Sequence, residues 1–460
     1  MVSVTVTSTA SVVPATPTPT PSGTAVVEDL AILDATGPPC YVTWIYVYEG
    51  EADETEAYKA SLAKVLVMYP QLAGSLVPLG GSNGRNALAL TDKGAVFEEA
   101  VAPELSFKSL TATQQPLPKE LARVDAVPAV SEDMPLLMAR LTRVQGGHVM
   151  SISLCHIVAD GSGAFAFMHS WGQVHRGEAV TQTPVHNRSL FSSGGAEPCS
   201  PEEGNAMYLV MPPMPAVMPP PPVEACDLNR PAPAPPVMPV IVGTCLHFPP
   251  SELSALKAQA MGEGLEGFVS TQDALSAHLW QCITRARGLD ADSMTRHTMA
   301  ANARQRLSPP VPDGYFGNCA LLPSTDSVKV SALLSLPLST VSRMVRQSLT
   351  DLTPDRARAV VSFLEHTEVG SLCAAAGFIS AIMGGDYAQT NWSSFPMWQV
   401  DFGQGTPIWG SIPDGPMAPG CVWITKAPQG GLVVTLGMEQ VPPTYIQWYT
   451  CHYTCLSLPP

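Results

Sequence analysis

Basic side chains, long apolar runs and regularly spaced cysteines are all scarce in this sequence of 460 residues. Only 24 Lys and Arg stand against 39 Asp and Glu, and a net charge of -15 argues against a nucleic-acid partner, which needs a basic face. No apolar run reaches the length of about 18 residues that indicates a membrane span. The first 23 residues hold no Lys or Arg and no apolar core, both of which a secretory signal needs, so we expect a cytoplasmic protein.

The eleven cysteines are an odd number without a repeating spacing. This pattern is typical of reduced thiols and argues against a disulfide framework. The nearest approach to a metal motif is formed by Cys451, His452 and Cys455. Because no second pair of ligands lies nearby in the sequence, we expect no metal site there.

The length of the chain predicts two domains, and its 45% hydrophobic and 14% charged content is that of a globular protein. Residues 209–240 are rich in proline, which removes hydrogen-bond donors and fixes φ, so we interpret them as an extended crossover without regular structure. A proline-rich ligand for a partner protein is the alternative. The predicted units are an N-terminal domain at 1–190 that is joined by part of 365–405, a crossover at 191–245 and a C-terminal domain at 246–460.

Periodicity in both halves favours mixed strands and helices in α/β or α+β layers. Apolar residues alternate with polar ones at 147–155, and short strand patterns (VWITK, GLVVTLGM) recur near the end of the chain. Helical spacing and end signals predict helices at the following positions: Tyr58–Tyr69, from Ser162 as N-cap to Gly177, 251–262, 271–287 with Thr271 as N-cap, and from Thr353-Pro354 onward.

His156 lies in the segment SISLCHIVADG, where a strand pattern gives way to a loop and then to a helix. Imidazole is the side chain best suited to proton transfer near neutral pH. Asp160 follows four residues later, where it could either brace the loop or orient the imidazole. Taken alone, the HxxxD pattern is frequent by chance, and a lone histidine is more often structural.

A second segment, QTNWSSFPMWQVDFGQG at 389–405, makes the HxxxD pattern specific when the two are taken together. His156-Ile-Val-Ala-Asp160-Gly161 and Asp401-Phe-Gly-Gln-Gly405 together resemble HxxxDG and DFGWG, the two hallmarks of the plant and fungal BAHD acyltransferases. Their separation is similar to that in the family. Other segments with recognisable counterparts are VVPATPTPTP, ASLAKVLVMYPQLAGSL, PLLMARLTR, DALSAHLWQCITRARGL and PPVPDGYFGN.

The resemblance implies an α/β fold of two chloramphenicol-acetyltransferase-like domains, with mixed sheets flanked by helices and a long crossover loop between them. The active site would lie in a tunnel between the domains. His156 would remove the proton of an alcohol or amine that attacks the thioester of acyl-CoA, the co-substrate. No bound cofactor, no metal and no covalent enzyme intermediate are expected. The expected partners are acyl-CoA and a small-molecule acceptor, and the protein is expected to be a monomer.

The resemblance also implies roles for residues beyond His156. Thr390 and Trp392 match the family's Thr-x-Trp and would donate hydrogen bonds to the oxyanion, a large term in such reactions; a core tryptophan at a strand end is the alternative for Trp392. Ser270 and Thr271 are the candidates for contact with CoA.

Structural roles near the site are implied for a second group of residues. Asp160 and Gly161 would hold the loop of the first motif, with the Asp160 side chain turned away from the substrate. Asp401 and Gly403 would belong to the second motif, away from the catalytic centre. Asp401 would pair with an arginine of Asn-Ala-Arg-Gln-Arg, for which Arg304 is the candidate.

Two departures from the family pattern carry predictions. Gln404 replaces the tryptophan of DFGWG, which predicts altered packing without loss of the chemistry. No Lys or Arg occurs between Arg358 and Lys426, whereas shikimate-accepting relatives hold the acceptor carboxylate with an arginine a dozen or so residues before the Thr-x-Trp. Because a buried carboxylate without a cationic partner is poorly held, we expect a neutral alcohol or an amine as acceptor.

Two other functions stay open at this point. A condensation-type domain shares the implied fold and an HHxxxDG loop but takes acyl groups from carrier proteins; here Cys155, not His, precedes His156, and the DFGxG element favours CoA. A catalytically degenerate relative would only bind a ligand or a partner. Intact His156, Asp160 and Thr390 argue against that function, and Gln404 is the feature in its favour.

Overall fold

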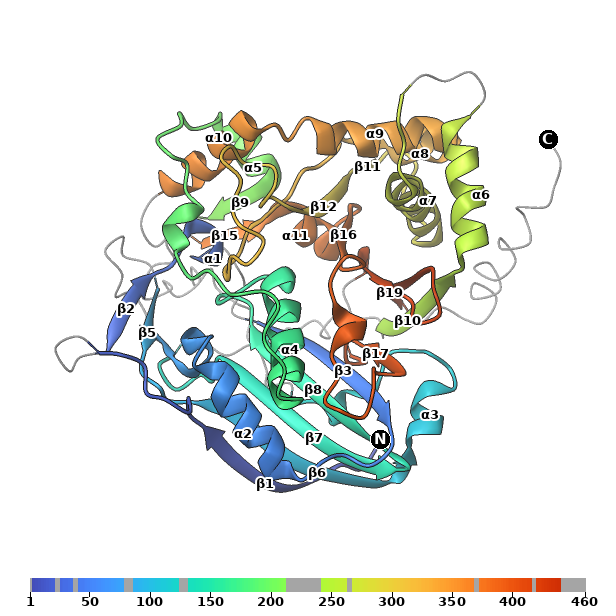
Figure 1. Cartoon of the computed structure of the whole chain (residues 1–460). Helices are drawn as coiled ribbons and strands as arrows, with labels where there is room; N and C mark the ends of the chain where they lie inside the picture. Colours follow the sequence, from blue (N-terminus) through green and yellow to red (C-terminus); the bar gives the residue numbers. More distant parts are fainter. Residues whose placement is uncertain are drawn as a thin grey trace, which may run out of the picture.

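The structure is a computed structural model that describes residues 2–20, 25–35, 40–77, 86–123, 131–211, 241–262, 267–367, 372–415 and 419–439. Most of its strands belong to two six-stranded sheets, one built mainly from the first half of the chain and the other from the second half (Figure 1). Both sheets are mixed and flanked by helices, so the predicted α/β class is confirmed.

The first sheet has the strand order β1-β6-β7-β8-β3-β17, in which only β6 and β7 run parallel. Its strands are β1 (Thr5–Val12), β3 (Tyr41–Glu49), β6 (Ala95–Ser106), β7 (Leu137–Gln145), β8 (Gly147–Cys155) and β17 (Trp409–Ser411). Helices α2 (Thr55–Leu66) and α4 (Gly161–His175) pack with this sheet around one core. The helix predicted from Tyr58 is α2, which buries Tyr58, Leu62, Val65 and Leu66.

The second sheet has the order β10-β19-β18-β16-β12-β13, in which β16 runs parallel to both of its neighbours. Its strands are β10 (Ile241–Phe248), β12 (His297–Asn302), β13 (Ala320–Leu321), β16 (Tyr387–Asn391), β18 (Cys421–Lys426) and β19 (Leu432–Glu439). Helices α6 (Pro250–Met261), α7 (Thr271–Ala286) and α9 (Leu338–Thr350) share a core with its strands.

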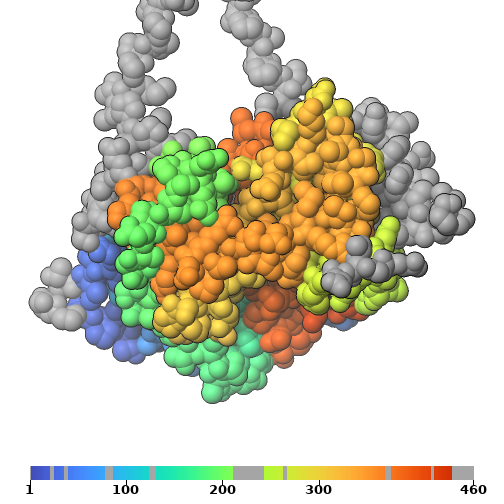
Figure 2. All heavy atoms as spheres, turned by 90° about the horizontal axis from the view of Figure 1, so that it is seen from above, coloured from blue at the N-terminus to red at the C-terminus, as the bar shows by residue number. Residues whose placement is uncertain are grey.

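Shorter elements cover the ends and edges of the two sheets. They are α1 (Ile32–Ala35), α3 (Phe107–Thr111), α5 (Pro201–Met207), α8 (Val330–Ser335), α10 (Pro354–Glu365), α11 (Ala376–Met383), β2 (Val26–Asp29), β4 (Ser75–Val77), β5 (Ala87–Leu90), β9 (Tyr208–Met211), β11 (Met294–Thr295), β14 (Val328–Lys329) and β15 (Leu372–Ala375). Although far apart in sequence, α5 and α10 lie side by side, green beside orange in the view from above (Figure 2).

Three helix starts test the predicted end signals. Thr353 caps α10 as expected, and Pro354 is its first residue. Asp160, not Ser162, caps α4, and Ser270, not Thr271, caps α7. Both wrong predictions have one cause: two residues able to cap stand within a turn of each other, and the residue with extended backbone just before the first turn takes the position.

The C-terminal half also contributes to the first sheet. Strand β17 pairs antiparallel with β3, and four buried side chains that precede it join the first core, namely Trp392, Met397, Val400 and Phe402. The stretch interpreted as a crossover without regular structure contains part of β9, so that prediction is wrong for residues 209–211. Residues 212–240 lie outside the described part, and the domain boundaries at 190 and 245 stay a prediction.

Three expectations concern groups that the structure describes only in part. The cysteines whose state is described are all free thiols: Cys40, Cys155, Cys199, Cys245, Cys282, Cys319 and Cys421. Cys451, His452 and Cys455 lie outside the described residues, among which no group of three or more potential metal ligands occurs. Within the same residues no helix combines the length and the apolar character needed to cross a bilayer.

Candidate active site

His156 is the first residue after β8, and its N–H donates to the Cys40 carbonyl at 2.8 Å. The residue is partly exposed, whereas its neighbours Cys155 and Ile157 are buried. Its Nδ1 is buried and has no hydrogen-bond partner among the described residues. Burial raises the pKa of Cys155 to about 12, so this thiol stays protonated and is no competing nucleophile.

Four residues later, Asp160 ties the loop to the second half of the chain. Its carboxylate accepts from Arg304 Nη1 at 2.8 Å and Nη2 at 3.0 Å, and from the backbone N–H groups of Gly163 and Cys319 at 3.0 Å each. Burial alone would raise the pKa of Asp160, but the Arg304 guanidinium and the two N–H groups hold that pKa below its ordinary value. Of the two roles that the sequence left open, these contacts fit bracing of the loop.

The expected pair of Asp401 with Arg304 is therefore wrong. The Asp401 carboxylate instead accepts from the N–H groups of Gly403 at 2.7 Å and Gly405 at 3.0 Å, and Arg176 Nη1 lies 4.0 Å from it. Both glycines have a positive φ, 101° and 96°, which favours glycine. With its side chain 26% exposed, Asp401 holds a turn and is no partner in a buried ion pair.

A second buried ion pair, which sequence reasoning missed, lies behind the same loop. Arg188 donates through Nη1 to Asp34 at 2.5 Å and through Nη2 to the Val158 carbonyl at 3.1 Å. The other Asp34 oxygen accepts from Asn318, whose Nδ2 also donates to the His156 carbonyl at 2.8 Å. The signal in the sequence is a single aspartate inside the otherwise apolar stretch LAILDA, because a buried charge requires a partner.

Thr390 and Trp392 lie together at the end of β16. The Trp392 indole N–H donates to Thr390 Oγ1 at 2.9 Å, and the largely buried ring packs edge-on against Phe165 of α4. A Cβ placed on Gly161 would lie 3.5 Å from Trp392 Nε1 and 2.8 Å from Phe395. These close contacts bring the start of α4, a few residues after His156, against the Thr-x-Trp element.

Ser270, a candidate for contact with CoA, has its hydroxyl engaged within the protein. Ser270 Oγ donates to Asp273 Oδ2 at 2.7 Å and accepts from the Asp273 N–H at 3.2 Å. The Ser270 N–H also donates to Asp273 Oδ2, at 2.7 Å, and the two backbone N–H bonds form a capping box. Arg346 pairs with the same carboxylate. The hydroxyl hydrogen of Ser270 is thus used on Asp273, and Thr271 stands in the first turn of α7.

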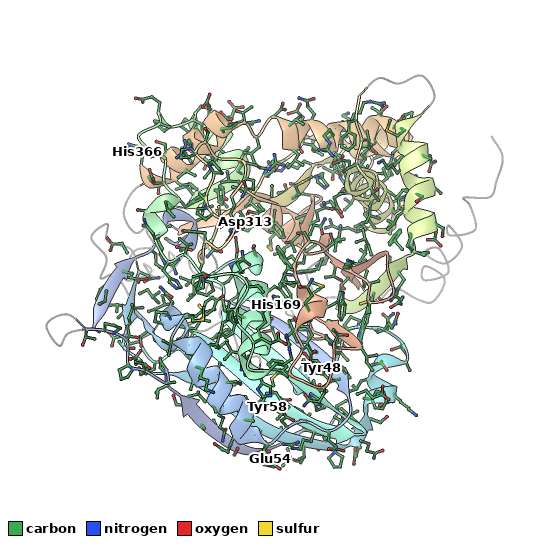
Figure 3. All side chains as sticks on the ribbon, in the orientation of Figure 1. Tyr48, Glu54, Tyr58, His169, Asp313 and His366 are labelled. Carbon is green, nitrogen blue, oxygen red and sulfur yellow. The ribbon has the colours of Figure 1, made fainter. Side chains whose placement is uncertain are left out.

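Gln404, at the position of the family tryptophan, makes two polar contacts with the first half of the chain. Its Nε2 donates to Asp53 at 2.8 Å, and the hydroxyl of Tyr58 on α2 donates to its Oε1 at 3.4 Å. Nearby, Tyr48 of β3, which Figure 3 labels together with Tyr58, donates through its hydroxyl to the Val400 carbonyl at 2.7 Å. These contacts join the loop to the first half of the chain, and altered packing relative to a tryptophan stays a prediction.

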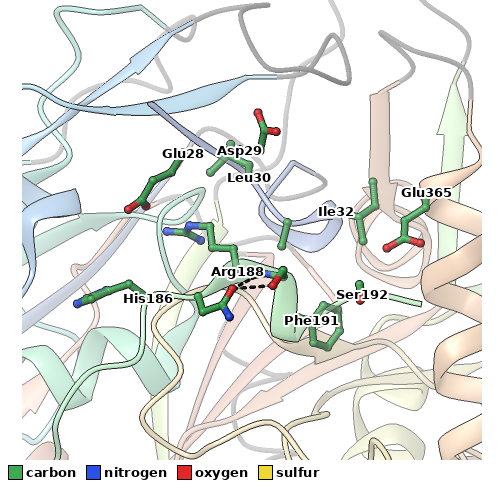
Figure 4. A pocket seen from close by; sticks show the side chains of 12 residues that line it. Glu28, Asp29, Leu30, Ile32, His186, Arg188, Phe191, Ser192 and Glu365 are labelled. Atoms are coloured by element: carbon green, nitrogen blue, oxygen red, sulfur yellow. Dashed lines mark hydrogen bonds between the residues drawn. The ribbon is translucent and has the colours of Figure 1, made fainter. Parts of the chain in front are cut away.

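Two cavities flank these elements. One of about 420 Å³ is lined by Glu28, His186, Arg188, Phe191 and Glu365, among others (Figure 4). A second of about 230 Å³ has a mixed lining of polar and apolar residues, namely Gln272, Met299, Ala300, Ala301, Asn302, Arg306, Leu349, Gln389 and Asn391. His156 lines neither, and Arg188 connects the wall of the first cavity to the loop that follows His156.

Known proteins resemble this chain over most of its length. A family model described as the Transferase family matches residues 2–419. Agmatine hydroxycinnamoyltransferase 1 of Oryza sativa subsp. japonica is 28% identical over 392 residues, 84% of either chain. Agmatine coumaroyltransferase-1 of Hordeum vulgare is 29% identical over 390 residues, again 84% of either chain.

Solved structures share the fold at lower identity. F. sporotrichioides TRI101, complexed with coenzyme A and T-2, superposes with a TM-score of 0.72 at 18% identity, covering 91% of this chain and 96% of that one. Vinorine synthase gives 0.68 at 19%, covering 97% and 98%. The first condensation domain of the calcium-dependent antibiotic synthetase gives 0.56 at 14%, covering 94% and 96%. The match of the family model to most of the chain, together with its acyltransferase relatives, confirms the resemblance seen in the two motifs: this protein is an acyltransferase of the BAHD family.

Proposed function

We propose that this acyltransferase moves an acyl group from acyl-CoA to a small neutral alcohol or an amine, with His156 as general base. One observation carries the proposal: a partly exposed histidine lies at the end of β8, on a loop that is fixed by contacts at both ends. A general base needs this combination of access and a defined position.

The proposed reaction uses the imidazole twice. With Nδ1 buried, Nε2 is the nitrogen that takes the proton of the acceptor as its oxygen or nitrogen attacks the thioester carbonyl. The tetrahedral intermediate collapses by breaking the carbon–sulfur bond, and the imidazolium returns the proton to the departing thiolate. The products are free CoA and an ester or amide, and His156 ends neutral. General base catalysis of this kind contributes about 10²–10⁴-fold.

Thr390 is the proposed donor to the oxyanion. Trp392 was expected to donate as well, but its indole N–H is directed to Thr390 Oγ1. That bond occupies a lone pair of the hydroxyl and leaves its hydrogen to donate elsewhere. Trp392 then acts through Thr390, by orienting the hydroxyl.

Sterics and charge both support a neutral or amine acceptor. The stretch from 359 to 425 holds no Lys or Arg, and α11 within it lies directly against β12. At Gly377 of α11 even a Cβ would lie 2.0 Å from Thr298 Oγ1, so a long cationic side chain does not fit there. Two relatives act, by their names, on agmatine, an amine, which favours an amine over an alcohol.

The test is release of free thiol from a panel of acyl-CoA thioesters that includes coumaroyl-CoA, each with agmatine, a neutral alcohol or no acceptor. The proposal predicts release that depends on the acceptor, with ester or amide detected by mass. A requirement for an acyl carrier protein would instead place the chain with the condensation-type enzymes. Binding of CoA without turnover for any pair would identify a degenerate relative.

A further inference from the structure

We infer that Asn318 is a positioning residue for His156, an inference that rests on the proposed function of His156 as general base and deepens it. Asn318 Nδ2 donates to the His156 carbonyl at 2.8 Å and lies 3.4 Å from the Ile157 carbonyl. The side chain is 5% exposed and comes from a segment 162 residues further along the chain. A buried amide is thus bonded to the backbone of the proposed base itself.

The orientation of this amide is fixed from its other side. Asp34 Oδ1 accepts from the Asn318 N–H at 2.7 Å and from Nδ2 at 3.0 Å, and Asp34 is fully buried in its pair with Arg188. Both hydrogens on Nδ2 are therefore used, one on Asp34 and one on His156. A flipped amide would set its oxygen against a carboxylate and a carbonyl, two acceptors, so the contacts demand the orientation with Nδ2 toward His156.

The next residue holds the other end of the loop. The Cys319 N–H donates to Asp160 Oδ2 at 3.0 Å, beside the two hydrogen bonds from Arg304. Two consecutive residues of the second half therefore hold the first and last positions of the HxxxD loop. Asn318 contacts the residue that carries the imidazole, whereas Cys319 contacts the residue that caps α4.

The imidazole depends on this backbone contact because its ring lacks the usual alternative. In a Ser-His-Asp triad an aspartate holds the imidazole through Nδ1. Here Nδ1 of His156 has no partner in the part of the chain that the structure describes, and the Asp160 carboxylate faces Arg304. The position of the ring is then set through its backbone. A displacement of about 1 Å at a reacting group can cost about 10²-fold in rate.

Asn318→Ala, compared with Ser362→Ala, separates positioning from simple loss of a buried hydrogen bond. Ser362 is fully buried and donates to the Ala196 carbonyl at 2.6 Å, a contact of the same kind between distant segments but outside the catalytic loop. At matched folded protein, we expect Asn318→Ala to lower kcat by about 10- to 100-fold, with KM for acyl-CoA and acceptor within about threefold of wild type. Ser362→Ala should keep its kcat.

A spectroscopic readout accompanies the kinetics. The ring resonance of His156, identified by its disappearance in His156→Ala, should shift or broaden in Asn318→Ala and stay in place in Ser362→Ala. Equal kcat in the two variants, or a loss carried by KM alone, would overturn the inference.

If Asn318→Ala does not fold, Asn318→Ser, which keeps one donor, is measured against the same control and must fall below it in kcat. An active His156→Ala would refute the proposed base itself, whereas an inactive one beside an unaffected Asn318→Ala refutes the positioning role alone.

Discussion

Arg304 donates two hydrogen bonds to the Asp160 carboxylate, at 2.8 and 3.0 Å, across 144 residues of sequence. The Arg304 side chain is 1% exposed and also donates to the Tyr315 and Gly317 carbonyls. The pair joins the HxxxD loop of the first half to the end of β12 in the second, so its removal acts on the candidate site and on the fold together.

Asp160→Asn should lower the free energy of unfolding by about 3–5 kcal/mol, because it leaves a buried guanidinium without its counterion. Urea unfolding at pH 7 measures the change. The folded-state pKa of Asp160 lies below its unfolded value, so the stabilisation is fully present above the unfolded pKa of about 3.9 and is lost as the pH falls through the folded pKa. The difference between wild type and Asp160→Asn should therefore be constant above about pH 5 and shrink below about pH 4. A difference that first shrinks between pH 5 and 8 would contradict this assignment.

Asp401→Ala should cost less, about 1–2 kcal/mol, because it removes hydrogen bonds to two turn N–H groups at a partly exposed position. The same urea experiment ranks the two aspartates. If Asp401→Ala proves as destabilising as Asp160→Asn, the Asp160–Arg304 ion pair does not stabilise the fold more than the turn contacts of Asp401 do.

Thr390→Val should lower kcat by about 10²–10³-fold, as removal of an oxyanion donor does, with little change in folding. Trp392→Phe keeps an aromatic ring but removes the indole N–H that binds Thr390, together with part of the packing against Trp44 and Phe165. We expect a smaller loss of kcat, about tenfold, from a less well oriented hydroxyl. Steady-state kinetics of both variants with one acyl-CoA and one acceptor provides the comparison. A larger loss for Trp392→Phe than for Thr390→Val would make the indole the direct donor.

Shikimate should be a poor acceptor compared with a neutral alcohol or an amine. Its carboxylate must leave water, and the stretch from 359 to 425 holds no cation to pair with it. The measurement is kcat/KM for shikimate against a matched neutral alcohol with the same acyl-CoA. An advantage of tenfold or more for shikimate would show that an arginine from elsewhere in the chain binds the carboxylate.

Local patterns predicted much of the fold. The alternation at 147–155 corresponds to β8, and the signal Thr353-Pro354 marks the start of α10, because both patterns depend on near neighbours. The cap of α4 was misplaced by two residues, since Asp160 and Ser162 both have suitable side chains and only the backbone path chooses between them. The motif also located His156 correctly at the end of a strand.

The partners of charged residues could not be predicted in the same way. Asp160 and Asp401 each belong to one of the two family motifs. Only the packing of the two halves decides which of the two carboxylates binds the Arg304 guanidinium. Asp34 and Arg188 are 154 residues apart and have no shared pattern, so their pair is visible only in three dimensions. Tertiary contacts of this kind support the loop of His156. A short sequence pattern such as LAILDA indicates that a buried charge needs a partner but does not identify the partner.

His156 as the proposed general base is tested most directly by the turnover of purified, folded His156→Ala with the acyl-CoA and acceptor pair that the wild type uses best. The fold should survive, because the carbonyl that Asn318 binds belongs to the backbone and remains. We predict a fall in kcat of at least about 10²-fold. A folded His156→Ala that keeps half of the wild-type activity would show that His156 is not the general base.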